Sequence, residues 1–103
     1  MARRTAPKRA LVMQARDNVA TLVEAVRSGE EVSAELDEES RIVRAGEEIP
    51  FGFKIALEDI PEGGDVIKYG ELIGRASASI GKGRLVHVHN VVGTRGRGDL
   101  EEV

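Results

Sequence analysis

The chain of 103 residues contains no cysteine and no tryptophan, and it has only one tyrosine and two phenylalanines. The absence of cysteine excludes a disulfide scaffold and thiolate chemistry, and it fits a reducing cytoplasm. Because aromatic side chains are few, the core is expected to be mainly aliphatic, and little surface is available on which nucleic-acid bases can stack. The uncharged stretch after Arg9 ends at Ala15, which is too short for a signal-peptide core or a membrane span. We therefore expect one cytoplasmic domain.

Charge is unevenly distributed along the chain, although the net charge is only −3. Residues 1–9 carry basic side chains and no acid, which is typical of a flexible tail, and we expect a second tail at residues 95–103. The predicted domain spans residues 10–94. Acids outnumber bases in residues 17–48, whereas bases outnumber acids in residues 54–97. The cationic half suits a small anionic ligand, and an unevenly charged, solvated surface explains the pattern equally well.

Short strands dominate the predicted secondary structure. We expect them where β-branched residues cluster or apolar and polar residues alternate, at residues 10–14, 51–57, 66–69 and 76–80. This alternation places Lys54 on the strand face opposite the two phenylalanines. Asp17 is a suitable N-cap, and apolar residues recur at helical spacing from there to Val26. The prediction is a mainly β domain of short, mostly antiparallel strands with one short N-terminal helix.

A local pattern recurs in which glycine stands three residues after one aliphatic residue and three before another. Its four copies are Val26-Gly29-Val32, Val43-Gly46-Ile49, Ile60-Gly63-Val66 and Ile80-Gly83-Val86. Glycine adopts positive φ without steric cost, and tight turns often require that conformation. We interpret each copy as the end of one element, a turn at the glycine and the start of a strand. Internal duplication explains the pattern less well, because the intervening segments share little else.

The only two histidines stand two residues apart, in the run Leu85-Val86-His87-Val88-His89-Asn90, which is typical of a strand. Alternation along a strand would place both imidazoles on one face, roughly 7 Å apart, with Val86 and Val88 buried opposite. Such a pair can bind a metal, transfer a proton or hold an anion. An ordinary strand surface facing solvent has the same pattern.

Other sites have weaker support. Gly81, five intervening residues and His87-Val88-His89 match the opening of a cupin metal motif, but the glutamate and third histidine that complete it are missing. A metal site within this chain would need carboxylates such as Asp17 or Glu71. Nucleophilic catalysis lacks both a cysteine and a Gly-x-Ser-x-Gly elbow. The terminal arginines could contact nucleic acid, but the negative net charge and scarce aromatics argue against it.

Several segments stand in the same order as in a known protein family. They are residues 17–20 (Asp-Asn-Val-Ala), 52–60 (Gly-Phe-Lys-Ile-Ala-Leu-Glu-Asp-Ile), 66–74 (Val-Ile-Lys-Tyr-Gly-Glu-Leu-Ile-Gly) and 86–90 (Val-His-Val-His-Asn). Together they resemble the small SAF domain of the altronate and galactarate dehydratases and the small subunit of sulfolactate sulfo-lyase. The resemblance runs from about Met13 to Thr94, which is most of the chain.

The resemblance implies a SAF-type β-clip fold that works with a much larger lyase domain, either fused or as a separate chain. The family's reactions eliminate water or sulfite from a hydroxylated carboxylic acid, usually with a divalent metal such as iron. The chain, ending at Val103, would be a cytoplasmic small subunit that is inactive alone. Its partners would be a large lyase subunit, which supplies most of the metal ligands, and a small anionic hydroxy acid. The alternative is a non-catalytic SAF module that binds a carbohydrate, an anion or a protein.

Carried over by position, the resemblance assigns His87 and His89 to catalysis and Lys54, Lys68 and Asn90 to substrate binding. An imidazole can ligate a metal or protonate the leaving hydroxyl, and Lys54 can hold the substrate carboxylate or sulfonate. For Lys68 a structural salt bridge is an equally good interpretation. No metal ligands are assigned.

The chain departs from the family pattern at two positions. Gln14 and Phe53 stand where family members commonly have histidine, within His-Pro-x-Asp-Asn and Gly-His-Lys patterns. Loss of two imidazoles lowers the metal-binding and proton-transfer capacity of this chain. Its substrate therefore differs, or its role has become mainly structural. Any imidazole chemistry must come from His87 and His89.

Overall fold

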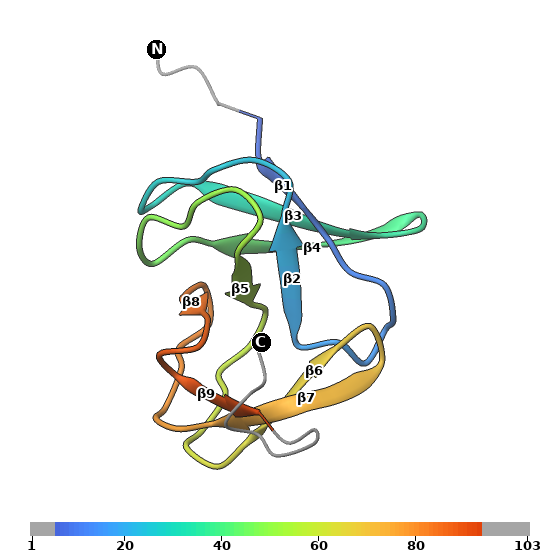
Figure 1. Cartoon of the computed structure of the whole chain (residues 1–103). Coiled ribbons are helices and arrows are strands. Elements are labelled where there is room, and N and C mark those ends of the chain that lie inside the picture. Colours follow the sequence, from blue (N-terminus) through green and yellow to red (C-terminus); the bar gives the residue numbers. More distant parts are fainter. Residues whose placement is uncertain (1–5, 94–103) are drawn as a thin grey trace.

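A computed structural model describes residues 6–93, which form nine short strands and no helix. The larger sheet has six strands, in the spatial order β4 (Glu39–Arg44), β3 (Glu31–Leu36), β1 (Lys8–Leu11), β2 (Val19–Leu22), β5 (Lys54–Ala56) and β8 (Leu85–Val86). The smaller sheet has three, in the order β6 (Asp65–Lys68), β7 (Glu71–Ala76) and β9 (Val91–Gly93). Figure 1 shows the smaller sheet below, with β2 and β5 of the larger sheet extending down toward it from β1, β3 and β4. The prediction of a mainly β chain is confirmed.

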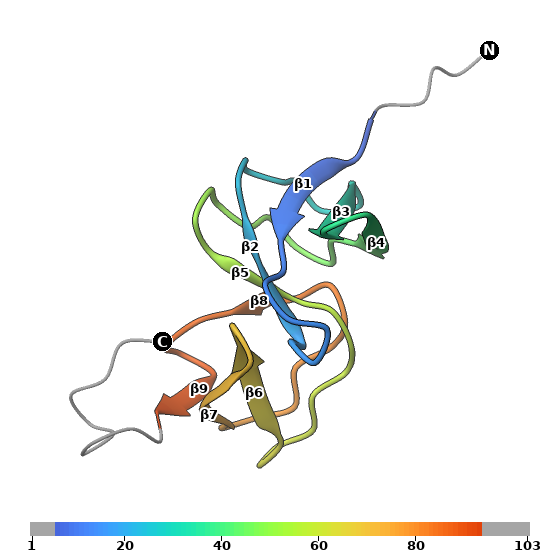
Figure 2. The same ribbon diagram turned by 90° about the vertical axis from the view of Figure 1, so that its right-hand side faces the viewer.

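The strands pair antiparallel with one exception among the described residues. β1 pairs parallel to β3, so the larger sheet is mixed. β2 and β5 occupy its middle and are buried on both faces. Alternate residues of these strands therefore enter two separate apolar clusters, for example Ile55 in one and Ala56 in the other. The second cluster fills the space between the sheets, where Figure 2 shows β6 and β7 beneath the lower end of β2.

The predicted helix from Asp17 to Val26 is wrong. Residues 19–22 form β2, which pairs with β1 and β5, and Val26 forms an isolated bridge to Ile49. The segment is rich in β-branched residues, which fit a pleated surface better than a helix. Asp17 does not cap a helix, because its carboxylate accepts hydrogen bonds from other segments, as described below. Sheet pairing on both sides of β2 thus overrides the helical spacing of its apolar residues.

Three predicted strands lie near observed ones, namely β1, β5 and β6, whereas β4 and β9 were not predicted. The predicted strand at 51–57 contracts to β5, and Phe51 lies in the turn before it. Phe53 packs against the first cluster, whereas Lys54 shares a face with Ala56 in the second, so the opposite orientation of Phe53 and Lys54 is confirmed. β6 lies close to the predicted strand, but β7 ends at Ala76, where another strand was expected to begin.

Glycine turns organise the chain largely as predicted. Gly29, Gly63 and Gly83 have φ of +91°, +82° and +88°, and each precedes a strand. A backbone hydrogen bond closes each turn, such as Gly64 N–H to Pro61 C=O at 2.8 Å. Gly46 instead lies in a bend, and Gly52, with φ of +87°, makes the fourth equivalent turn. The aliphatic residues that precede these turns pair two by two, through the bridges Val26↔Ile49 and Ile60↔Ile80.

Both predicted tails fall largely outside the described residues. Residues 1–5 and 94–103 are not described, and β1 begins at Lys8, within the segment expected to be a tail. No helix in residues 6–93 has the length and hydrophobicity needed to cross a bilayer.

Candidate functional site

Lys54 is the most unusual charged residue of the fold. It begins β5 with only 5% of its surface exposed, and its register partners are Thr21 and Val86. Within residues 6–93 it makes no salt bridge and no side-chain hydrogen bond. Burial, and secondarily the positive charge of Lys68, lower the pKa of Lys54 from 10.5 to about 8. A buried cation without a partner destabilises the fold, so this lysine has no evident structural purpose.

Lys68 lies at the end of β6, in the neighbouring sheet, and its charge acts on Lys54. Its Nζ lies 4.7 Å from the centre of the Tyr69 ring, a cation–π contact. The salt bridge considered for Lys68 is not seen among residues 6–93. Tyr69 and Gly70 have φ of 57° and 76°, which is the geometry of a two-residue type I′ hairpin turn. The hairpin thereby holds a cation beside an exposed aromatic ring.

The histidines do not share a strand face, and that prediction is wrong. β8 ends at Val86, and residues 87–90 turn, closed by Asn90 N–H to His87 C=O at 3.0 Å. The Asn90 side chain fixes this loop by accepting from His87 N–H at 2.9 Å and donating to Leu85 C=O at 2.8 Å. Asparagine favours turns because its amide bonds nearby backbone groups, and here that preference ends the strand.

His87 is the more enclosed of the two imidazoles. Its ring lies 4.5 Å from that of Phe53, centre to centre, with the planes at 46°. Its Nδ1 is buried, whereas His89 is exposed. Because Val86 pairs with Lys54 in the sheet, the backbone of His87 follows directly after the register partner of the buried lysine, while the His87 ring packs against Phe53.

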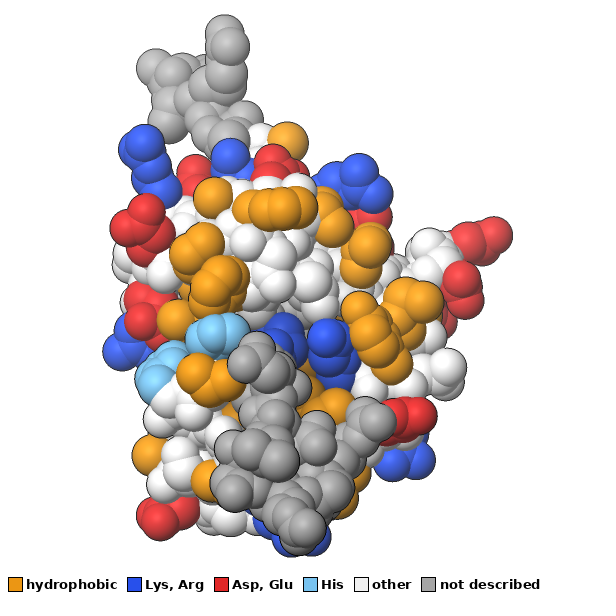
Figure 3. All heavy atoms as spheres, in the orientation of Figure 1, with side chains coloured by type: hydrophobic (Ala, Val, Ile, Leu, Met, Phe, Trp, Pro, Cys, Tyr) orange, Lys and Arg blue, Asp and Glu red, His pale blue; other side chains and the backbone are white. Residues whose placement is uncertain are grey.

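Lys54 begins β5, Lys68 ends β6 close enough for its charge to act on Lys54, and His87 follows β8, the strand that pairs with β5, so three distant segments bring these residues to one region. We call this region the lysine–histidine face. Figure 3 shows both histidines in a row with two basic side chains across the middle of the molecule, with hydrophobic side chains beyond the basic end of the row and above and below the histidines. A concentration of positive charge with a neutral or protonated imidazole can hold an anionic group and move a proton next to it.

Asp17 and Asn18 hold the smaller sheet against the larger one. The Asp17 carboxylate accepts four backbone N–H bonds, from Tyr69 at 3.0 Å, from Gly70 at 2.7 Å, and from Met13 and Gln14 at 3.2 Å each. The Asn18 side chain bonds both Asp65 C=O and Ile67 N–H at 2.8 Å. Sequence analysis gave Asp17 another role and Asn18 none, because their main partners lie about fifty positions away.

The positions of Gln14 and Phe53 lie at opposite ends of the lysine–histidine face. A Cβ on Gly70 would lie 2.8 Å from Gln14 Cγ, so the Gln14 side chain covers the hairpin turn beside Lys68. Phe53 covers His87. Tyr69 and Phe53 are thus parts of this face that sequence analysis did not identify as such. The Tyr-Gly pair after a β-branched run is a hairpin signal that points to the first of them.

The described residues do not form a metal site by themselves. No three side chains of the metal-binding types His, Cys, Asp and Glu come together within residues 6–93. Asp17, one of the carboxylates considered for this purpose, already accepts four backbone hydrogen bonds. A divalent metal therefore does not fit this chain's described donors alone.

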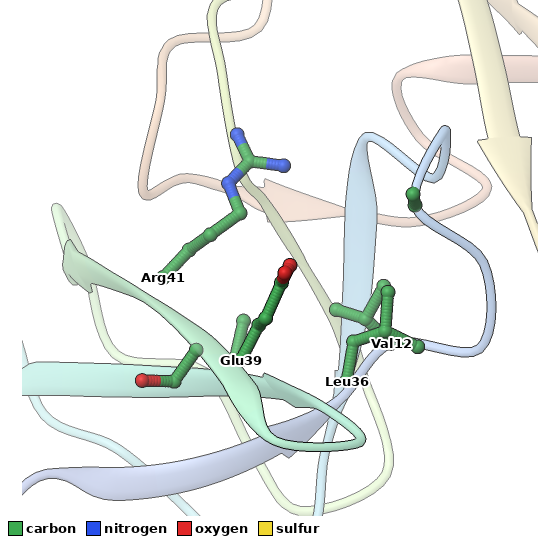
Figure 4. Close-up of a pocket in the computed structure, with 7 residues that line it drawn as sticks. Val12, Leu36, Glu39 and Arg41 are labelled. Atoms are coloured by element: carbon green, nitrogen blue, oxygen red, sulfur yellow. The ribbon is translucent and has the colours of Figure 1, made fainter.

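A separate pocket of about 90 Å³ lies beside the β3–β4 hairpin, away from this face (Figure 4). Its lining is mainly apolar, from Val12, Ala15, Ala34, Leu36, Glu39, Ser40 and Arg41. Arg41 is already engaged, since its guanidinium donates to Leu57 C=O at 3.1 Å and lies 3.8 Å from Glu58. The pocket therefore lacks the available cations that characterise the lysine–histidine face.

Comparison with known proteins identifies the family. The model of the altronate/galactarate dehydratase SAF domain matches residues 8–94. This chain belongs to that family. It is 41% identical over 78 residues to altronate dehydratase of Escherichia coli (strain K12), covering 76% of this chain and 15% of that protein. The SAF-domain chain thus spans only a small part of that enzyme.

A second relative has a length closer to that of this SAF-domain chain. The (2R)-sulfolactate sulfo-lyase subunit alpha of Chromohalobacter salexigens is 39% identical over 72 residues, which cover 68% of this chain and 77% of the relative. Galactarate dehydratase (L-threo-forming) of Escherichia coli (strain K12) is 48% identical over 46 residues, covering 45% of this chain and 9% of that enzyme. The chain is therefore related to dehydratases and lyases, including one subunit of a multi-subunit enzyme.

Proposed function

We propose that this SAF-domain chain is the small subunit of a sugar-acid dehydratase or a sulfolactate-type sulfo-lyase, and that it completes the active site of a separate large catalytic chain in the cytoplasm. The observation that carries the proposal is the lysine–histidine face, where Lys54 and Lys68 make no salt bridge within residues 6–93 and the enclosed His87 packs against Phe53. The similarity to a lyase subunit of comparable length supports the two-chain arrangement.

The chemistry of elimination explains why these residue types are useful. Removing the proton next to a carboxylate builds negative charge on an enediolate, which positive groups stabilise. Lys54 and Lys68 would hold the substrate carboxylate or sulfonate, and an imidazole would protonate the departing hydroxyl group. His87 follows Val86, the register partner of Lys54, and would take this role, with His89 in the same loop. Asn90 would contribute by holding the loop in shape, in addition to the substrate contact assigned to its position.

A divalent metal such as iron would be held mainly by the large chain. Within residues 6–93 no three metal-binding side chains come together, so we assign no ligand here. The reaction role of this chain is accordingly confined to binding the anionic substrate, orienting it and transferring a proton.

Co-expression with a large lyase chain tests the proposal. The candidate is a chain similar to the part of altronate dehydratase that lies outside the segment matched here. Size-exclusion chromatography should show a complex, and the complex should consume altronate, galactarate or sulfolactate. We expect His87→Ala to lower kcat by about 10²-fold or more, as for loss of a general acid, and His89→Ala separates the roles of the two imidazoles. Lys82→Met, at an exposed lysine, is the control.

Failure of the two chains to associate would contradict the proposal, as would full turnover by both histidine variants. The unpaired cations favour one alternative, a non-catalytic module that binds a small anion. That module would bind galactarate or phosphate as an isolated chain, lose binding in Lys54→Met, and show no elimination in any complex.

A further inference from the structure

Exposed apolar side chains stand at one end of the lysine–histidine face, beside Lys68. Tyr69 and Met13 expose 51% and 55% of their surfaces. Their backbone N–H groups both donate to Oδ2 of Asp17, at 3.0 Å and 3.2 Å, so the two residues are neighbours in space. A buried carboxylate thus fixes the backbone of two exposed apolar residues next to a cation.

A second apolar pair stands at the other end, beside His87. Val88, 51% exposed, follows His87 in the loop that Asn90 closes. Phe51, 68% exposed, lies in the same turn as Phe53, whose ring contacts His87. Exposed large apolar side chains therefore stand beside Lys68, in Met13 and Tyr69, and beside His87, in Val88, while Phe51 is exposed in the turn that leads to Phe53. Figure 3 shows hydrophobic side chains beyond the basic end of the row of basic and histidine side chains, and above and below the histidines.

An apolar rim, that is, exposed apolar side chains gathered around a functional site, is typical of a surface that binds another protein. We propose that the large lyase chain docks on this face, packing against Met13, Phe51, Tyr69 and Val88 and enclosing Lys54, Lys68 and His87. This inference rests on the proposed function, since it names the surface through which the two chains meet. Carboxylates of the large chain or of the substrate would supply counter-charges for Lys54 and Lys68.

A second copy of this chain is a poorer occupant. A symmetric contact between two such faces would bring both copies of Lys54 and Lys68 together, and like charges repel. The large chain has no such restriction, because the cationic centre then meets a surface of different composition. The charge of the face therefore favours a heterologous partner.

The experiment compares apolar-to-charged substitutions inside and outside the proposed interface. Val88→Asp and Phe51→Asp alter the rim, and Ile42→Asp is the matched control on edge strand β4, since Ile42 is 50% exposed. Affinity of each purified full chain for the large chain is measured by biolayer interferometry. We expect about tenfold or greater weakening for the two rim variants, as for central interface residues, and a change within about twofold for the control. Circular dichroism of each isolated chain confirms that the variant is folded.

Hydrogen exchange of the unaltered complex provides a measurement that needs no variant. Binding should protect residues 50–53, 68–70 and 87–90, and leave residues 39–43 of β4 unchanged. Protection of β4 instead, or wild-type affinity of both rim variants in an active complex, would overturn the docking surface while leaving the proposed function intact. Self-association of the isolated chain that the rim variants abolish would assign the face to a second copy and also overturn it. Absence of any complex would refute the proposed function itself.

Discussion

Two groups of buried polar residues contrast sharply in this SAF-domain chain. Asp17 and Asn18 are 2% and 7% exposed, and their side chains together make six hydrogen bonds to backbone groups. Lys54 is 5% exposed, and it makes no hydrogen bond or salt bridge through its side chain within residues 6–93. The two groups are equally removed from solvent but differ completely in whether their polar atoms have partners.

The difference distinguishes polar residues that stabilise the folded state from polar residues that are available to bind a ligand. A buried polar group with partners stabilises the folded state and joins the segments that it contacts, as Asp17 joins the 13–14 segment to the β6–β7 turn. A buried cation without a partner opposes folding, and chains retain it where a ligand supplies the missing charge. Opposite effects on stability are therefore expected when the two kinds of residue are replaced.

The largest expected effect is that of Asp17→Ala. The substitution removes the acceptor of four backbone N–H groups, and we expect the free energy of unfolding to fall by about 3–4 kcal/mol. Urea denaturation followed by circular dichroism measures it, with Glu38→Ala in the exposed β3–β4 turn as control. A loss no greater than in the control would show that backbone pairing alone joins the two sheets.

Lys54→Met should act in the opposite direction, by raising the free energy of unfolding at pH 7. The folded state lowers the pKa of Lys54 to about 8, below its ordinary value of 10.5, because of burial and then the Lys68 charge. The unfolded chain therefore binds this proton more tightly, and the resulting destabilisation is fully present below pH 8. It is relieved as the pH rises from about 8 to 10.5, by up to about 3 kcal/mol.

The measurement is the difference in unfolding free energy between the unaltered chain and Lys54→Met from pH 7 to pH 10. The advantage of the variant should shrink as the pH rises, and Lys82→Met should show no such trend. A pH-independent difference would mean that Lys54 is charged throughout and has found a counter-ion. A less stable variant would mean that the lysine stem contributes more through packing than its charge costs.

The sequence predicted the β class and the turns better than the site geometry. Glycine turns depend on local conformational freedom, and three of the four predicted copies carry positive φ. The helix was wrong because Asp17, locally a good N-cap, is bonded to Tyr69 and Gly70, which lie 52 and 53 residues further along. Such partners cannot be identified from local spacing.

The site residues were predicted in part. Family resemblance assigned Lys54 and Lys68 by position, but their mutual proximity depends on how the two sheets pack, since β5 and β6 belong to different sheets. The sequence predicts a strand for the histidine pair because valine stands at every second position between Leu85 and His89. It does not indicate that the side-chain amide of Asn90 closes a turn. The roles assigned to Lys54, Lys68, His87, His89 and Asn90 stay predictions that the assays above address.

Replacing Asn90 has the smallest expected effect on the free energy of unfolding. Its side chain is hydrogen-bonded, as those of Asp17 and Asn18 are, but its partners lie within the same loop. Its two hydrogen bonds reach residues three and five positions away, within one loop. Asn90→Ala should therefore lower the free energy of unfolding by only about 1 kcal/mol, well below the effect at Asp17. It should still displace the histidines, since the loop that carries them loses its closing contacts.

Imidazole resonances in NMR spectra of the isolated chain distinguish the two effects. We expect both histidine signals to shift in Asn90→Ala while the amide signals of β1 to β4 stay in place. Asn90→Asp keeps the acceptor for His87 N–H and loses the donor to Leu85 C=O, so it should shift the signals less. Unchanged histidine signals in Asn90→Ala would show that Phe53 packing, and not the asparagine, positions His87. Large shifts at small energetic cost would instead establish that local hydrogen bonds shape the site while long-range ones stabilise the fold.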